Sequence, residues 1–504
     1  MPHCARHQLL STAQQTRRDD RLRLSRRYIA AGLVWGLWVA AQAQGLPPEV
    51  DAALARAKIP REAMAVLLVD AQGQAAPRVS HRASTAMNPA STIKLVTTFA
   101  ALELLGPGYT WGTPVFMDGA VRDGTLYGNL IIQGQGDPRL VLERLWLLLR
   151  RVQGMGIHTI AGDIVLDNTA FAVPATDPSA FDGEPLRPYN ATPDALLINF
   201  KSVVMTFSPE PGSTLARVQF DPPLAGVQMQ TTVPLLAGDC PDYRSALKAD
   251  FSDPRAIRFA GGYAQSCGEK VWAVAYADPK SYATRAVQGT WQAMGGKLNG
   301  TVRMGSLSGT TAAATKPVFE VRSAPLAEVI RDINKFSNNV MAQQVYLTLG
   351  RTPTTPASAN STTEVFGAPA TFEASHKVVQ RWWTDRLGAD DMPVLENGAG
   401  LSRTERISAN ALGRMLQLAY ASPLMPELMG SLPITGVDGT LRRAKTRANG
   451  FAHLKTGSLN EVVAVAGYVH AAGGKRFVLV AIVNHPNARA ARPAIEAMID
   501  WASR

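Results

Sequence analysis

Two long apolar runs near the C-terminus constrain the fold more than any other feature of the sequence. They are Asn460–His470 and Arg476–His485, and the Gly-containing segment between them is typical of a β-hairpin. The pattern after them predicts an amphipathic helix over Ala491–Arg504. Near the other end, Met64–Gly73 predicts a strand and a turn, and apolar spacing predicts a helix over Pro89–Leu105. These elements fit one α+β domain in which both helices cover an antiparallel sheet.

A long insertion separates the two parts of this domain. From about Thr113 to Thr315, short β-like runs alternate with Gly, Pro and Asp turns. Two helices are predicted inside it, over Leu140–Gly156 and Ser281–Gly295. An amphipathic pattern then spans Pro325–Gly350, and a Pro/Ser/Thr-rich loop follows over Arg351–Thr371.

The N-terminus has the composition of an export signal. Arg17–Arg27 is basic, Tyr28–Ala40 is apolar, and small residues offer a cleavage site after Ala43. The apolar run is too short for a good transmembrane helix, so we expect residues 1–43 to be a signal peptide and the mature chain to be periplasmic. Two alternatives stay open: an uncleaved anchor, and the twin-arginine route that Ser25–Ala31 faintly suggests.

Charge and motifs argue against several classes of partner. The formal net charge is +11, but seven arginines lie in the predicted signal, so the rest of the chain is only mildly basic. No clustered basic patch with interleaved aromatics follows, and we therefore expect no nucleic-acid partner. No dinucleotide fingerprint, Walker loop or zinc-helix motif is present, and we expect neither cofactor nor metal.

Removal of the signal would leave two cysteines, Cys240 and Cys267. An even pair in an exported chain predicts a disulfide. No His or further Cys stands at ligand spacing beside them, which favours a structural disulfide over a metal site.

Ser91 and Lys94 share one face at the start of the predicted Pro89 helix. Asn88 and Pro89 can open that helix, which leaves Ser91 free for chemistry. Apolar neighbours and the dipole of an early turn both favour a neutral amine at Lys94. A neutral lysine can take the proton of a serine nucleophile.

The order of three motifs is more informative than any one of them. Ser-x-x-Lys also occurs at Ser245–Lys248 and Ser-x-Asn occurs four times, but Lys-Thr-Gly occurs once. In chain order, Ser91-x-x-Lys94, Ser337-Asn338-Asn339 and Lys455-Thr456-Gly457 match the motif set of penicillin-recognising serine enzymes.

On these motifs the chain resembles the class C low-molecular-mass penicillin-binding proteins, which are D-alanyl-D-alanine carboxypeptidases and endopeptidases. Four further stretches resemble that family: Gln133–Leu140, Gly162–Phe171, Asn397–Ser408 and Ile434–Ala444. The resemblance implies a penicillin-recognising serine transpeptidase-like fold split by a mostly β insertion of two small domains. The expected boundaries are 44–112 and 315–504 for the catalytic domain, 113–200 and 285–314 for one inserted domain, and 201–284 for the other.

The chemistry of these residue types suggests a role for each motif. Ser91 attacks a peptide carbonyl, Lys94 takes its proton, and Ser337 with Asn339 returns a proton to the leaving amine. Lys455 and Thr456 offer charge and hydrogen bonds to a terminal carboxylate, and the strand that follows them can dock the substrate backbone edge-on. Gly457 and Ser458 come just before that strand, and the backbone N–H groups of Ser91 and Ser458 can stabilise the oxyanion. By resemblance, the diamino-acid side chain of the stem peptide contacts Arg403, Asp167 and Asn460, the last of which stands where relatives often have Gln.

The sequence therefore predicts an exported serine DD-peptidase that cleaves D-Ala-D-Ala or cross-link bonds of peptidoglycan through a Ser91 acyl-enzyme. Peptidoglycan stem peptides are the expected partners, and β-lactams are the expected covalent inhibitors. Peripheral membrane association and a homodimer are left open. Two other readings remain: a β-lactamase or related serine esterase, and a non-enzymatic peptidoglycan-binding protein.

Overall fold

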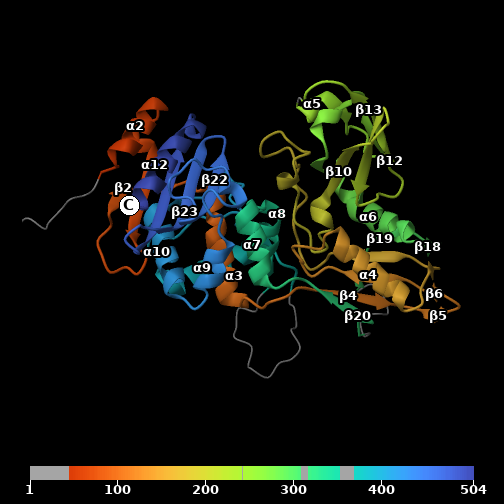
Figure 1. The fold of residues 1–504 in the computed structure, drawn as a ribbon. Coiled ribbons are helices and arrows are strands. Elements are labelled where there is room, and N and C mark those ends of the chain that lie inside the picture. Colours follow the sequence, from red (N-terminus) through yellow and green to blue (C-terminus); the bar gives the residue numbers. More distant parts are fainter. Residues whose placement is uncertain (1–44, 241, 308–315, 352–367) are drawn as a thin grey trace, which may run out of the picture. The chain divides into compact units, whose positions relative to one another are not determined.

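The computed structural model describes residues 45–240, 242–307, 316–351 and 368–504 (Figure 1). The predicted signal peptide lies outside the described residues, as does most of the Pro/Ser/Thr-rich loop. Within these ranges, no helix combines the length and the apolar character that crossing a bilayer requires.

A five-stranded antiparallel sheet joins the two ends of the described chain, in the order β2-β1-β24-β23-β22. Its strands are β1 (Met64–Asp70), β2 (Val79–His81), β22 (Ala452–Leu459), β23 (Val462–His470) and β24 (Arg476–Asn484). The predicted hairpin is β23 and β24, and the predicted N-terminal strand is β1. Because β1 pairs along its whole length with β24, the red and blue segments meet in one sheet (Figure 1).

Both faces of this sheet are buried, which explains the continuous apolar runs. Along β1, Val66 and Leu68 face one core, and Leu67 and Val69 face the other, as the two-residue period of a strand requires. Helices α2 (Pro48–Arg56) and α12 (Arg492–Ala502) pack in the first core. The second core lies against α3 (Lys94–Leu105), α7 (Leu326–Phe336), α8 (Asn339–Leu349), α9 (Phe372–Leu387), α10 (Ala409–Ala421) and α11 (Met425–Ser431). The predicted α+β class, with helices covering a sheet, is confirmed.

The predicted helix at Pro89 begins differently from the expectation. Residues Ala90–Ile93 form a 3-10 turn, η2, and the α-helix α3 starts at Lys94. Asn88 is not its cap: the Asn88 side chain accepts a hydrogen bond from the Ala90 N–H (2.9 Å) and donates one to the Ser402 carbonyl (2.9 Å). The tighter turn therefore carries Ser91, and Lys94 opens the α-helix.

The amphipathic pattern over Pro325–Gly350 also breaks, into α7 and α8. Ser337 adopts the left-handed conformation (φ 57°, ψ 37°), which ends α7. The Asn338 side chain then accepts a hydrogen bond from the Met341 N–H (3.0 Å) and caps α8. Residues expected within one helix thus lie at a helix junction.

The inserted segment carries several sheets. One runs in the order β19-β9-β7-β4-β20 and another in the order β16-β13-β11-β10-β17; a four-stranded sheet (β18-β8-β6-β5) and a three-stranded one (β12-β15-β14) complete the set. The β21-β3 pair lies outside the insertion, in the catalytic part of the chain. The strands of the first are β4 (Gly112–Met117), β7 (Leu130–Gln133), β9 (Ile164–Asp167), β19 (Val302–Met304) and β20 (Phe319–Arg322), and those of the second are β10 (Ser202–Pro209), β11 (Leu215–Asp221), β13 (Thr232–Leu236), β16 (Tyr263–Ala264) and β17 (Lys270–Ala275). The remaining elements are β3 (Ala86–Met87), β5 (Ala120–Arg122), β6 (Thr125–Tyr127), β8 (Thr159–Ile160), β12 (Gln228–Met229), β14 (Ala249–Asp250), β15 (Ala256–Phe259), β18 (Lys297–Leu298), β21 (Ile407–Ser408), α4 (Leu142–Gly154), α5 (Tyr243–Leu247) and α6 (Pro279–Ala293).

Two of the expected domain boundaries do not coincide with the ends of elements. The boundary between residues 284 and 285 falls inside α6. Strand β20, on the catalytic side of the expected boundary at 315, pairs with β4 of the insertion. Both inserted sheets also share one hydrophobic core, to which Ile132, Phe207 and Trp291 contribute. Cys240 and Cys267 form a disulfide at the edge of the second sheet.

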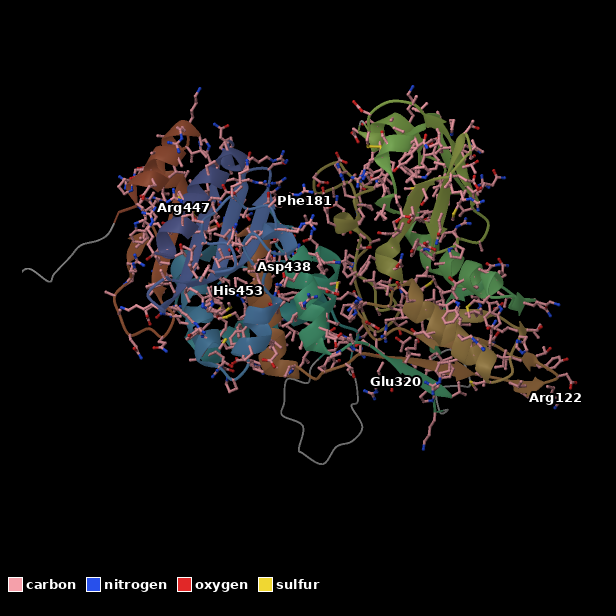
Figure 2. The ribbon with its side chains drawn as sticks, viewed as in Figure 1. Arg122, Phe181, Glu320, Asp438, Arg447 and His453 are labelled. Atoms are coloured by element: carbon pink, nitrogen blue, oxygen red, sulfur yellow. A yellow bond between two sulfur atoms is a disulfide. The ribbon has the colours of Figure 1, made fainter. Side chains whose placement is uncertain are left out.

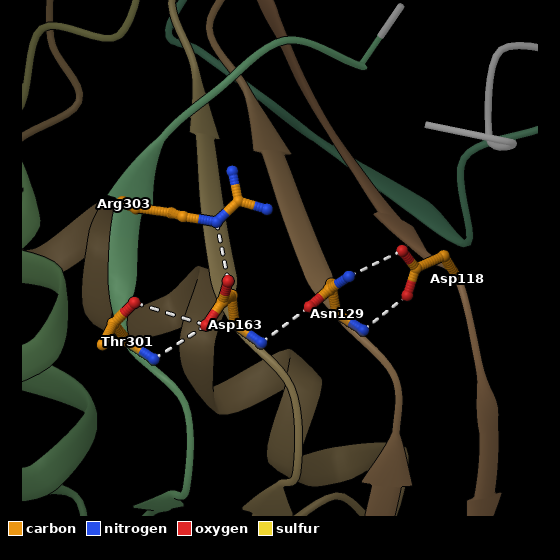
Figure 3. A network of polar contacts seen from close by, with 5 residues as sticks. All are labelled: Asp118, Asn129, Asp163, Thr301 and Arg303. Carbon is orange, nitrogen blue, oxygen red and sulfur yellow. Dashed lines mark hydrogen bonds and ion pairs between the residues drawn. The ribbon is translucent and has the colours of Figure 1, made fainter. Parts of the chain in front are cut away.

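A polar network ties together neighbouring strands of the first inserted sheet (Figure 3). The Asn129 side chain donates to Asp118 (2.8 Å) and accepts from the Asp163 N–H (2.7 Å). Asp163 in turn accepts from the Thr301 N–H (2.9 Å) and pairs with Arg303 (2.6 Å). Since these residues lie after β4, before β7, before β9 and in or beside β19, the network fixes the register of four strands at one end.

Candidate active site

Ser91 and Lys94 form a hydrogen-bonded pair at the start of α3. The Lys94 Nζ donates to the Ser91 Oγ (2.8 Å), to the Asn339 Oδ1 (2.7 Å) and to the carbonyl of Ala399. The lysine side chain is fully buried. Burial lowers its pKa to about 7, although the charge of Glu405 acts to raise it. A substantial fraction of Lys94 is therefore neutral near pH 7, as a base for Ser91 requires.

A second lysine–serine pair faces the first. The Lys455 Nζ donates to the Ser337 Oγ (2.8 Å) and to the Thr456 carbonyl (2.7 Å). Burial, and then the neighbouring charge of Lys94, lower the pKa of Lys455 well below its ordinary value. The left-handed backbone of Ser337 thus presents its hydroxyl to the lysine of the third motif.

Strand β22 passes directly beside Ser91. A Cβ at Gly457 would lie 2.6 Å from the Pro89 carbonyl oxygen and 3.2 Å from the Ser91 nitrogen, so only glycine allows this approach. In the described chain β23 is the one strand of the sheet that pairs with β22, and on the other edge of β22 an isolated bridge joins His453 to Ile434, which leaves that edge open from Lys455 onward. This open edge can accept an extended peptide chain beside Ser91.

These residues open into one cavity of about 930 Å³. Its lining includes the predicted residues Ser91, Ser337, Asn339, Arg403, Thr456, Gly457, Ser458 and Asn460. Lys94 and Lys455 lie buried beneath it, where they reach the two serines. The structure therefore brings together all the candidate site residues except Asp167.

Asp167 does not reach the cavity. Its carboxylate, at the end of β9, accepts hydrogen bonds from Gln133 (3.1 Å), from Thr169 (2.7 and 2.9 Å) and from the Leu307 N–H (2.9 Å). The side chain is buried with these donors, which gives it a structural role within the insertion.

Asp182 lines the cavity instead, although no sequence pattern distinguishes it from other polar loop residues. Its carboxylate accepts hydrogen bonds from the Tyr189 hydroxyl (2.8 Å) and from the Asn190 side chain (2.8 Å). Partial burial raises the pKa of Asp182, but these two hydrogen bonds, the Glu184 N–H and the charge of Arg187 together leave the pKa below its ordinary value. Asp182 is therefore an anion at neutral pH.

Next to Asp182, the Phe181 ring packs against Arg403, whose guanidinium carbon lies 4.6 Å from the ring centroid. Figure 2 labels Phe181 where a loop of the insertion comes near the catalytic sheet. Asn460 also lines the cavity, and its side chain accepts a hydrogen bond from Arg489 (2.9 Å).

The second copy of Ser-x-x-Lys has no such geometry. Ser245 donates to Asp242 (2.7 Å) at the start of the short helix α5, and Lys248 is exposed in a left-handed turn. Across the described ranges, no group of three or more His, Cys, Asp or Glu side chains is arranged to hold a metal ion.

Comparison with known proteins decides the family. The model of the D-Ala-D-Ala carboxypeptidase 3 (S13) family matches residues 46–504. The chain belongs to this family. As an S13 member it is a serine peptidase of the D-Ala-D-Ala carboxypeptidase class.

Individual relatives agree with the S13 assignment. The chain is 27% identical, over 81% of its length and 75% of the relative, to a D-alanyl-D-alanine carboxypeptidase of Actinomadura sp. (strain R39). It is 24% identical to the carboxypeptidase DacB of Haemophilus influenzae, over 80% of this chain and 82% of the relative. The crystal structure of penicillin-binding protein 4 from H. influenzae shares the fold, with a TM-score of 0.65 at 22% identity over 89% of this chain and 99% of that one.

Proposed function

We propose that this S13 peptidase hydrolyses D-alanyl bonds of peptidoglycan stem peptides, both terminal D-Ala-D-Ala bonds and D-Ala–diamino-acid cross-links, through an ester on Ser91. One observation carries the proposal: a buried lysine with a pKa lowered to about 7 donates to the Ser91 hydroxyl, while a second buried lysine donates to Ser337. The pairing supplies a base for the nucleophile and a proton donor for the leaving group.

In the first step, the Ser91 Oγ bonds to the substrate carbonyl carbon as its proton passes to the neutral Lys94 Nζ. The carbonyl oxygen becomes an oxyanion, which the backbone N–H groups of Ser91 and Ser458 stabilise. The closeness of Gly457 to the Ser91 nitrogen supports this pairing of N–H groups.

Collapse of this intermediate breaks the C–N bond and leaves an ester on Ser91. The departing amine takes a proton from the Ser337 hydroxyl, and the Lys455 Nζ, which donates to that hydroxyl, replaces the proton. Water then hydrolyses the ester and frees Ser91. Thr456, whose hydroxyl lies 2.7 Å from that of Thr440, offers a hydrogen bond to the carboxylate of the leaving residue.

We also propose that β-lactams acylate Ser91. Two proteins of similar fold have been solved with such compounds: penicillin-binding protein 4 of H. influenzae with a β-lactam (TM-score 0.63), and a predatory endopeptidase of Bdellovibrio bacteriovorus acylated by penicillin G (TM-score 0.50). The same lysine–serine geometry in this chain supports the same reaction.

Muropeptide digestion tests the function directly. Purified protein is incubated with uncross-linked pentapeptide muropeptides and with cross-linked dimers, and the products are identified by mass. We expect loss of the terminal alanine from the first and conversion of the second to monomers, together with a stable penicillin adduct. Rapid accumulation of hydrolysed penicillin without muropeptide cleavage would favour a β-lactamase, and binding of both muropeptides without any cleavage would favour a binding protein.

Asp182, Phe181 and Arg403 form a subsite that we assign to the diamino-acid side chain. The Asp182 carboxylate is suited to a free amine, and a charge-assisted hydrogen bond of this kind contributes about 1.5–3 kcal/mol. We expect Asp182→Asn to lower kcat/KM about tenfold or more for stem peptides with a free side-chain amine, and to leave N-acetylated peptides unchanged.

The matched control for this subsite is Asp177→Asn, in the same loop but outside the cavity lining. It should leave both peptides unaffected. If Asp182→Asn lowers kcat/KM equally for peptides with a free amine and for N-acetylated peptides, the assignment of the subsite is contradicted.

We further propose that the chain is exported to the periplasm, where its substrate lies. The basic and apolar composition of residues 17–40 and the small residues before Gln44 support export. Peripheral membrane association and a homodimer stay predictions.

A further inference from the structure

A buried carboxylate lies behind the catalytic lysine. Glu405 is fully buried, and one of its oxygens, Oε1, accepts hydrogen bonds from three consecutive backbone N–H groups, those of Glu396 (3.0 Å), Asn397 (3.1 Å) and Gly398 (3.0 Å). Successive N–H groups that converge on one oxygen form an anion-binding nest. The mechanism described above makes no use of this group.

The same loop reaches both catalytic side chains. Its next residue, Ala399, presents the carbonyl that accepts a hydrogen bond from the Lys94 Nζ. Gly400 then passes so close to η2 that a Cβ there would lie 2.7 Å from the Ser91 nitrogen. The Gly398 carbonyl accepts from Thr97, one turn after Lys94 on α3 (2.7 Å). Glu405 therefore holds the loop that contacts Ser91 and Lys94.

The hydrogen bonding of Glu405 favours its ionised form. Three N–H donors stabilise a carboxylate, and they offer nothing to a carboxylic O–H. Its second oxygen, Oε2, has no hydrogen-bond partner among the described residues, so a proton there would have no acceptor. Burial is the largest influence and raises the pKa of Glu405 above its ordinary value, whereas the backbone donors and the charge of Lys94 act to lower it.

Few charged or titratable groups surround Lys94. Lys455 approaches from β22, Glu405 from the loop after α9, and the buried Tyr346 hydroxyl of α8 interacts with Glu405. Asn339, which also accepts from Lys94, does not titrate. Among the described residues, Glu405 is thus the negative charge that acts on Lys94.

We propose that Glu405 is a positioning residue that sets the protonation of Lys94: its carboxylate, fixed in the backbone nest, stabilises the ammonium form of Lys94 and orients the Ala399 carbonyl toward it. Glu405 touches neither substrate nor the reacting atoms. Its charge raises the pH at which Lys94 becomes a neutral base. The inference rests on the proposed function, in which Lys94 takes the proton of Ser91.

Replacing Glu405 by glutamine tests this role, because glutamine keeps an oxygen for the nest and removes the charge. Loss of the negative charge lowers the pKa of Lys94, so more of the lysine is neutral at acidic pH. The rate of penicillin acylation is measured from pH 5 to 9, and its acidic limb is the part of this profile in which the rate rises with pH. We expect this limb to move to lower pH by about 1 unit in Glu405→Gln. A folded Glu405→Gln protein whose limb coincides with that of the wild type would overturn the inference.

Two companion variants separate charge from loop structure. Glu396→Gln removes an exposed carboxylate from the same loop, and its limb should coincide with that of the wild type. Glu405→Asp keeps the charge in a shorter side chain. The maximal acylation rate of this variant should fall, while the pH at which its rate rises should stay that of the wild type. A rise that moves to lower pH, as in Glu405→Gln, would also overturn the inference. If wild-type protein is not acylated at all, the proposed function fails, whereas acylation with an unmoved limb defeats only the role of Glu405.

Discussion

Replacement of Ser91 by alanine is expected to abolish both penicillin labelling and D-alanine release. The Ser91 hydroxyl accepts a hydrogen bond from the buried Lys94 Nζ in the cavity, and its backbone nitrogen lies beside Gly457 of β22. Without the Oγ no ester can form, so labelling should fall to background. The measurement is gel fluorescence after incubation with a fluorescent penicillin, together with alanine release from pentapeptide muropeptides.

The chain supplies its own control for this experiment. Ser245 stands in the second Ser-x-x-Lys copy, where its hydroxyl donates to Asp242, the capping residue of α5. Ser245→Ala should label and cleave like the wild type. Labelling that persists in Ser91→Ala, or that disappears in Ser245→Ala, would contradict Ser91 as the nucleophile.

The catalytic motifs were predictable because each is short and fixed in order. Ser91 and Lys94 are three residues apart, so one helical turn, of either 3-10 or α type, brings them together. Lys455 lies just before two strands, β23 and β24, whose continuous apolar runs were recognisable from composition alone. Local helix geometry and the order of the motifs were thus enough to predict most of the site residues.

The backbone around these motifs depends on contacts that the sequence does not display. The positive φ of Ala90 (45°) and of Ser337 (57°) places Ser91 and Ser337 where a regular helix would not. Both conformations are unfavourable for residues other than glycine, and tertiary packing must hold them. Apolar periodicity continues through both positions, so it predicted unbroken helices.

The aspartates of the insertion show a second reason why the sequence alone could not predict the whole site. Asp167 and Asp182 both stand in polar, turn-like stretches, and only the tertiary structure separates the one that supports β9 from the one that lines the cavity. Glu405 is similar, since a fully buried acid within a polar stretch resembles a surface residue. In the first inserted sheet, a Gly and a polar residue precede the apolar residue that begins each of three strands, at Gly128–Leu130, Gly162–Ile164 and Gly300–Val302, and apolar periodicity did not predict this pattern.

Replacement of Lys94 by methionine is expected to lower the rate of acylation by about 10³-fold, within the range that a positioned general base contributes. Methionine has a similar length and suits a fully buried site, so the fold should persist. The loss arises because the Ser91 proton then has no acceptor: Asn339 and Ala399, which also contact the Lys94 Nζ, offer oxygens that are poor bases. The measurement is the second-order rate constant for penicillin acylation, with thermal unfolding as the test of folding.

The pH dependence of the wild type provides the second half of this test. Burial lowers the pKa of Lys94 to about 7, and only its neutral form can take the proton. The acylation rate should therefore rise with pH through about 7 and be lost below it, whereas the residual rate of Lys94→Met should lack this limb. Lys248→Met, in the exposed second motif, should keep both the rate and the limb of the wild type. A folded Lys94→Met protein that acylates within about tenfold of the wild type, with the limb intact, would show that another group accepts the proton, because the loss expected from a general base is at least 10²-fold.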